Sequence, residues 1–131
     1  MEWLDLVTNP QGLRGIFQGD APPLVGVSLH EVSIGREGPT LRLRFDLPTF
    51  PSNPPANWRR NGFNAVQVEL LFGGISELSL HGVGVEMVVD INMEHDGRVV
   101  LDVRSPIVRV AALAASVTVS RVDAYLDAER E

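Results

Sequence analysis

The carboxylates that could form a binding site gather on one predicted β-hairpin, which spans residues 85–103. Its two arms alternate apolar and polar residues, and matching their apolar faces leaves a three-residue loop at residues 95–97. Gly97 then takes the left-handed conformation that such a loop requires. In this register Asp90 lies directly opposite Asp102 on the outward face. Like charges placed directly opposite each other destabilise a sheet by up to about 1 kcal/mol, so this pair needs an explanation.

Three interpretations of this acidic face are open. Glu86 and Glu94 belong to the same predicted face, and Glu94 is expected to meet Arg98. In the first interpretation, Arg104 or Arg109 neutralises the facing acids, and the face has no partner. In the second, the negative surface is kept for a basic protein, because complementary charge speeds association and confers specificity. In the third, the carboxylates bind a divalent cation, although two acids on a flat strand face make a poor calcium cage.

A proline-rich segment at residues 48–64 is the second candidate binding element. Four prolines fall within eight residues and are followed by Trp58, Arg59 and Arg60. Trp58 could fold back and cap an open end of the core, with Arg59 or Arg60 stacked on its ring. Alternatively, Trp58 and Arg59 project as anchors, since Trp and Arg are enriched at binding hot spots. The prolines would then stiffen the loop and lower the cost of ordering it on binding.

Catalytic and cofactor-binding patterns are missing from the sequence. The three histidines, His30, His81 and His95, are isolated and show no spacing typical of metal ligands. The glycines fit turns rather than a phosphate-binding loop, and no G-x-S-x-G elbow occurs. The chain has no cysteine, which excludes thiol catalysis and cysteine-bound zinc. We therefore expect no enzymatic activity, no cofactor and no metal, although a triad assembled in space would leave no trace in the sequence order.

The elements that position these residues are predicted to be mainly β. Alternating hydrophobicity and turn residues predict about eight antiparallel strands, arranged as a sandwich or as a curled sheet or barrel. The apolar phase reverses at residues 30–31 and again near residues 120–121, which predicts a β-bulge at each place. In the strand at residues 40–47, Asp46 is expected to face solvent. Two short helices precede the strands, and Asn9 is expected to cap the second one.

Length and charge limit the classes of function. The 131 residues fit a single domain, residues 1–131, and the formal net charge is −6. An acidic balance disfavours nucleic acids and anionic membranes, which bind basic patches, and it suits a basic protein partner. No apolar run approaches the roughly 20 residues that span a bilayer. The opening "MEWLDLV" has two acids and no base, unlike a secretory signal, so we expect a cytoplasmic protein.

Three stretches of the sequence are distinctive beyond their strand pattern. They are "WLDLVTNPQGLRGIF", "LHEV" and "GPTLRLRFDLPTFPSNPPANWRRNGFNAVQVELLFGGISELSLHG", the last with "RFDLP", a double proline and "W…GFN" in this order. In these stretches, and over most of its length, the chain resembles the immunity protein 50 family of bacterial polymorphic toxin systems. The C-terminal third is similar only as alternating strands. The family often has an aromatic residue after the glycine that corresponds to Gly82, so a role for such a ring does not carry over to Val83.

This resemblance implies a mostly β protein that binds a cognate toxin domain and neutralises it in the cytoplasm of the producing cell, without catalysis. Toxin-binding residues are expected to vary among cognate pairs, so a proline segment shared by the family favours an architectural role for Trp58. A nuclease-type toxin, which must hold phosphates, would offer a basic cleft to the acidic hairpin face. From the residues themselves we expect the toxin to contact Glu86, Asp90, Glu94, Asp102, Trp58 and Arg59.

Two questions stay open at the level of the sequence. The chain is compatible with a monomer and with a dimer. It is also compatible with a different function, a β-barrel or sandwich that holds a small ligand. An internal apolar cavity of several hundred Å³ would favour that alternative.

Overall fold

The computed structural model describes residues 2–19 and 21–129. In this part of the chain, eight antiparallel strands form one sheet in the order β4-β7-β6-β5-β1-β2-β3-β8. The strands are β1 (Val27–Gly35), β2 (Thr40–Asp46), β3 (Ala65–Gly73), β4 (Glu77–His81), β5 (Val88–Asp96), β6 (Arg98–Arg104), β7 (Arg109–Ala114) and β8 (Ser116–Tyr125). The helices are η1 (Trp3–Leu6), α1 (Gln11–Phe17) and α2 (Ala56–Arg60). The predicted mainly β fold with short N-terminal helices is confirmed.

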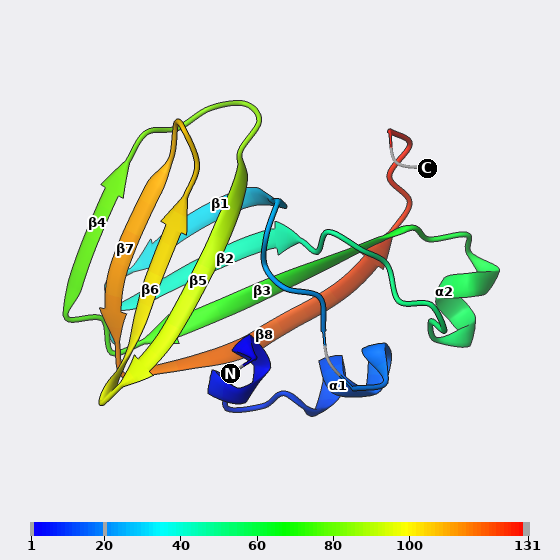
Figure 1. Ribbon diagram of the computed structural model, residues 1–131, viewed down its shortest axis with the longest axis horizontal. Helices are drawn as coiled ribbons and strands as arrows, with labels where there is room; N and C mark the ends of the chain where they lie inside the picture. Colours follow the sequence, from blue (N-terminus) through cyan, green and yellow to red (C-terminus); the bar gives the residue numbers. More distant parts are fainter. Residues whose placement is uncertain (1, 20, 130–131) are drawn as a thin grey trace.

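The sheet bends sharply between β1 and β5. These two strands share only two residue pairs, Val27 with Val89 and Ser28 with Val88. The bend divides the sheet into layer A, made of β1, β2, β3 and β8, and layer B, made of β4, β7, β6 and β5 (Figure 1). Because β4 and β8 end the strand order without pairing to each other, the curled sheet is not closed into a barrel.

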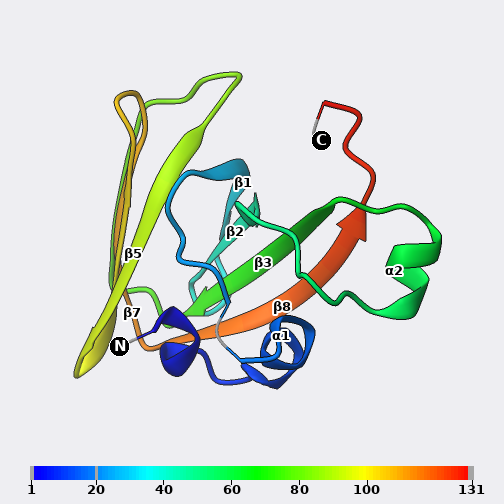
Figure 2. The same cartoon turned by 45° about the vertical axis from the view of Figure 1, so that its right-hand side comes forward.

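The hydrophobic core lies between the two layers. Its largest fully buried side chains include Phe45 and Phe72 of layer A and Leu101 of layer B. Helices η1 and α1 lie across the lower opening between β5 and β8 (Figure 2). Trp3 of η1 belongs to the core, and its indole Nε1 donates a hydrogen bond to the Pro22 carbonyl at 3.0 Å. Burial of such side chains contributes roughly 1.5–3 kcal/mol each, so the short helices are held by packing rather than by their own length.

Both predicted β-bulges are confirmed. The register between β1 and β2 shifts between Leu29 and Glu31, which leaves His30 as the extra residue. The register between β3 and β8 shifts opposite Glu69, where Ser120 is the extra residue and its hydroxyl donates to the Glu69 carboxylate at 2.8 Å. Each bulge returns the apolar residues beyond it to the core face, which is why the sequence reverses its phase there.

The predicted cap of the second helix is wrong. The Asn9 side chain does not cap α1; its amide nitrogen donates to the Val119 carbonyl at 2.8 Å, and its amide oxygen accepts from the Val119 N–H at 2.8 Å. The backbone N–H of Thr8 also donates to the Val117 carbonyl at 2.9 Å. Residues 8–9 therefore fasten the N-terminal segment to the outer edge of β8.

The register of the β5–β6 hairpin differs by two residues from the prediction. Met93 pairs with Leu101 rather than with Val99, so the turn is centred on Gly97. The predicted positive φ of Gly97 is confirmed, at 72°. Matching the apolar faces excludes a register that is shifted by one residue, because such a shift turns every side chain to the other face. It does not exclude a shift of two residues, which keeps the same side chains in the core. The observed register also avoids the unfavourable acid–acid pair, because Asp90 now lies opposite Arg104.

Candidate functional site

The face of layer B that points away from the core is an uncovered sheet surface that combines apolar and charged side chains. Its strands alternate between buried and more accessible residues, and in the described part of the chain no helix or strand lies over it (Figure 2). We call it the outer face. It carries Glu77, Ser79 and His81 of β4, Arg109, Ala111 and Leu113 of β7, Val100, Asp102 and Arg104 of β6, and Asp90, Asn92 and Glu94 of β5.

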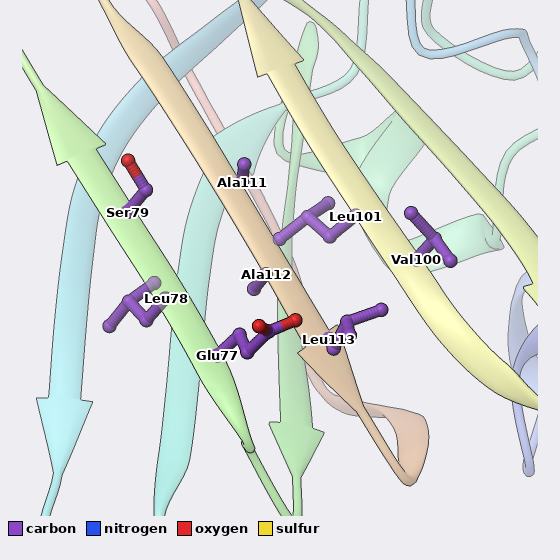
Figure 3. Close-up of a pocket in the computed structure, with 8 residues that line it drawn as sticks. All are labelled: Glu77, Leu78, Ser79, Val100, Leu101, Ala111, Ala112 and Leu113. Carbon is purple, nitrogen blue, oxygen red and sulfur yellow. The ribbon is translucent and has the colours of Figure 1, made fainter.

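A shallow groove of about 520 Å³ crosses the middle of the outer face, over β4, β7 and β6. Val100, Ala111 and Leu113 supply its apolar side chains, and Glu77 and Ser79 stand on its β4 side (Figure 3). These side chains meet because the strands pair in register: Leu113 lies between Glu77 on one side and Val100 on the other. An apolar centre with a polar rim is the usual anatomy of a protein-binding surface.

The charges beside this groove are largely paired. One carboxylate oxygen of Asp102 accepts a hydrogen bond from the Arg104 Nε at 2.6 Å. The Arg109 Nε lies 3.6 Å from the other oxygen. The Asp90 carboxylate accepts the backbone N–H of Gly26 at 2.9 Å, which ties the loop before β1 to β5. The structure thus separates the two acids predicted to face each other, and Arg104 and Arg109 neutralise Asp102, as the first interpretation of this face requires.

Glu94 stays on the outer face but has a different neighbour from the one predicted. It lies opposite Val100, while Arg98 lies opposite Asp96 and donates to the Gly74 carbonyl at 2.7 Å. Glu94 is exposed, and within the described residues its side chain forms no ion pair. Glu77 and Glu94 therefore flank the apolar groove on its two sides, without an ion pair among the described residues.

The structure places the other three predicted site residues away from the outer face. Glu86 lies in the loop before β5, where it lines a separate cleft with His30 and Asp46. Trp58 and Arg59 belong to α2, at the far end of the molecule from β4 (Figure 1). Of the six predicted residues, the fold brings together only Asp90, Glu94 and Asp102.

The proline-rich segment folds into α2 and packs back onto the protein. Trp58 is partly buried against the core, and its ring centroid lies 6.0 Å from that of Phe50 in a tilted arrangement. Trp58 therefore caps an end of the core, as the architectural interpretation predicts. That interpretation also placed Arg59 or Arg60 on the ring; the Arg59 guanidinium donates instead to the Asn53 side chain at 2.8 Å. The five-residue helix itself was not predicted, because the prolines around it dominate the sequence pattern.

A second polar cluster, which the sequence analysis did not predict, surrounds Asp46. This carboxylate was expected to face solvent, yet Asp46 is only 3% exposed. It interacts with the His30 Nε2 at 3.0 Å and accepts from the Gln67 Nε2 at 3.2 Å and from the Tyr125 hydroxyl. The partners come from β1, β3 and β8, so the cluster joins all four strands of layer A. A buried carboxylate is costly unless donors surround it, and here they do.

The Asp46 cluster lines a cleft of about 580 Å³ beneath the loop before β5. Its partners are 16, 21 and 79 residues away along the chain, so no local motif could reveal it. The one available signal was the bulge at His30, which turns that side chain toward β2. Because His30, Gln67 and Tyr125, which contact Asp46, all come from other strands of layer A, we assign the cluster a structural role.

Glu31 forms a third polar contact, on the surface of layer A. It accepts hydrogen bonds from the Arg44 Nε at 3.1 Å and from the Ser33 hydroxyl at 3.1 Å. The hydrogen bond from Arg44 is the main cause that lowers the pKa of Glu31 below its ordinary value, and the bond from Ser33 adds to it. The carboxylate therefore keeps its charge to a lower pH than an isolated glutamate would.

Three features of the described residues bear on other kinds of site. Residues 2–19 and 21–129 contain no group of three or more His, Asp or Glu side chains that could hold a metal ion. In the same ranges, no helix is long and apolar enough to cross a membrane. An apolar hollow of about 360 Å³, lined by Val32, Met87 and Val110 among others, lies between the layers; it opens beside Leu80, which is 43% exposed.

Comparison with known proteins identifies the family. A search of the curated proteins and a search of the solved structures gave no match. The family model described as immunity protein 50 matches residues 9–125. The matched region includes every strand of both layers and both α-helices. Since it covers most of the 131 residues, this chain belongs to the immunity protein 50 family.

Proposed function

We propose that this protein binds a cognate toxin domain of a polymorphic toxin system and neutralises it by stoichiometric binding in the cytoplasm of the producing cell. Membership of the immunity protein 50 family supports a toxin as the partner. The toxin contacts the outer face of layer B, centred on the groove between Val100 and Leu113. The observation that carries this choice is an uncovered sheet surface with an apolar centre and a charged rim.

Charge favours a basic toxin, such as a nuclease that must hold phosphates. The formal net charge of the chain is −6, and Glu77 and Glu94 stand on either side of the groove without an ion pair among the described residues. Asp102 is paired with Arg104 and Arg109, so it presents ion pairs to the toxin rather than an unpaired negative charge. Paired arginines of this kind favour specificity, because a partner must match a defined pattern of both signs.

The decisive experiment places a charge in the groove and measures binding to the toxin domain encoded beside this gene. Leu113→Arg puts a cation into the apolar centre, and loss of a central contact costs about 2 kcal/mol or more, or roughly 30-fold in Kd. Leu126→Arg is the matched control, because Leu126 is 63% exposed and lies beyond β8. Melting temperatures of both variants establish that they are folded.

Wild-type affinity in Leu113→Arg, or an equal loss in Leu126→Arg, would show that the outer face is not the binding surface. A growth assay with the toxin expressed in the same cell gives an independent readout, since a variant that cannot bind cannot protect. Protection by the wild-type protein at less than one copy per toxin would argue for turnover and against neutralisation by binding.

Stopped-flow measurements distinguish the contribution of the rim acids to binding from that of the apolar groove. Glu94→Gln removes a free rim charge, so we expect slower association at low salt and a difference from wild type that shrinks at high salt. Leu113→Ala is expected to act mainly on dissociation, because it removes contact area and no charge. Salt-independent association of Glu94→Gln would contradict a basic partner at this rim.

A further inference from the structure

One edge of the sheet is unprotected. Strand β4 pairs with β7 on one side, and in the described part of the chain no element pairs with its other side (Figure 1). The opposite edge of the sheet is partly covered, because Thr8 and Asn9 form hydrogen bonds with the backbone of β8 at Val117 and Val119. An uncovered edge strand exposes unpaired backbone N–H and carbonyl groups, which are a template for another strand.

The five residues of β4 are complementary to themselves in antiparallel pairing. About a two-fold axis at Ser79, Glu77 of one copy lies opposite His81 of the other, Leu78 lies opposite Leu80, and Ser79 lies opposite Ser79. Both leucines lie on the core-side face and both ionisable residues on the outer face. Apolar side chains therefore pair with apolar ones, and an acidic side chain pairs with a basic one. A parallel arrangement would instead place Glu77 opposite Glu77.

The side chains concerned are free to make these contacts. Glu77 and His81 are exposed and have no side-chain hydrogen bond or ion pair among the described residues. Leu80 is 43% exposed at the open side of the core, and a second copy would cover it. His81 lies beside Arg109 of β7, which lies beside Arg104 of β6. Glu77 of a second copy would therefore meet the end of a basic row.

We propose that two copies of this chain associate by antiparallel pairing of their β4 strands about a two-fold axis at Ser79, so that both layers B form one continuous sheet. Isologous contacts of this kind are the commonest in homo-oligomers. The contact spans only the five residues of β4, below the size of a standard stable interface, so the dimer is weak and depends on concentration. The proposal does not rest on toxin binding and is tested without a toxin.

The absence of native cysteine allows a direct cross-linking test. Directly paired residues in antiparallel strands have Cα atoms about 4.5–5.5 Å apart, within the roughly 4.4–6.8 Å that a disulfide spans. Ser79→Cys places one thiol on the two-fold axis of a chain that has none of its own. Mild oxidation should then give a covalent dimer. Ser120→Cys is the control, because Ser120 is exposed on the other edge strand. This variant should remain largely monomeric. Equal dimer yields from both variants would overturn the proposed axis.

Sedimentation equilibrium over micromolar to millimolar protein tests the charge pattern. Glu77→Arg places a cation opposite His81, and His81→Glu places an acid opposite Glu77. Each change acts twice in the symmetric dimer, so we expect each to weaken association by about tenfold. The double variant restores opposite charges and should regain the wild-type constant. Glu94→Arg changes the same face away from the edge and should have no effect.

A wild-type protein that is monomeric at millimolar concentration would overturn the proposal. So would single variants that associate as the wild type does, or a double variant that fails to recover. Circular dichroism spectra of all variants show whether a change in association reflects a change in fold. Since β7 already pairs with the inner side of β4, substitutions of outward side chains at this edge should leave the monomer intact.

Discussion

Asp46 offers the sharpest test of the physical reasoning, because one substitution removes the anion on which three strands converge. In Asp46→Asn, one carboxylate oxygen becomes an NH₂ group that faces donors from His30, Gln67 or Tyr125. Hydrogen bonds to charged groups contribute about 1.5–3 kcal/mol each, and they are not additive within one network. Loss of one bond and weakening of another predicts about 3 kcal/mol of destabilisation. For a chain of this length that corresponds to roughly 10 °C in melting temperature.

Urea unfolding followed by tryptophan fluorescence measures this effect, since Trp3 and Trp58 both pack against the core. The matched control is Asp123→Asn, because Asp123 is an exposed acid of β8 whose one ion pair among the described residues is with Arg121. We expect that control to remain within about 0.5 kcal/mol of the wild type. If Asp46→Asn also remained within that range, the cluster would not hold layer A together.

The same variant separates structure from function. Because the toxin is proposed to contact layer B, Asp46→Asn should keep wild-type toxin affinity at a temperature where it is folded. A double-mutant cycle with Tyr125→Phe should give a coupling energy of about 1 kcal/mol, as expected for side chains in one hydrogen-bond network. A folded Asp46→Asn protein that no longer binds the toxin would move the binding site to the cleft beside this cluster.

Three further outcomes follow from the geometry. Asp102→Asn leaves its two arginine partners without an anion and should lower the free energy of unfolding by about 1 kcal/mol in urea, whereas Glu94→Gln should not. Gly97→Val forces a branched residue to a φ of 72° and should cost about 1–3 kcal/mol in thermal unfolding, with Gly97→Asn clearly milder. Glu31 has a lowered pKa, so its contact with Arg44 stabilises the fold above the ordinary value of 4.5 and is lost as the pH falls below it. The difference in melting temperature between wild type and Glu31→Gln should therefore shrink in acid.

The parts of the fold that the sequence could predict are those that depend on local alternation. Apolar residues at every second position indicated the strands, and the phase reversals at His30 and Ser120 indicated both bulges. A phase reversal is informative because only an inserted residue can return the following side chains to the core. The positive φ of Gly97 was predictable for the same local reason, since few other residues tolerate it.

The parts that the sequence could not predict depend on contacts between distant segments. Face matching could not distinguish hairpin registers that differ by two residues, and that shift separated Asp90 from Asp102. Asp46 sits at a solvent-facing position of its strand, and side chains from three other strands surround it. The proline-rich segment could either project or fold back, and the packing of Trp58 on the core decides between the two.

The register of the hairpin also decides what kind of binding surface the outer face can be. With Asp90 opposite Asp102, the face would have been a concentrated negative patch, and its affinity would have depended on salt throughout. In the observed register, Arg104 lies opposite Asp90 and donates to Asp102, and an apolar groove of about 520 Å³ lies beside them. In the complex that we propose, Glu77 and Glu94 at the rim would steer association, while contact area in the groove would set the lifetime of the complex. A long-lived complex of this kind would depend on apolar contact, because salt at cellular concentration weakens the attraction between exposed charges but not apolar contact.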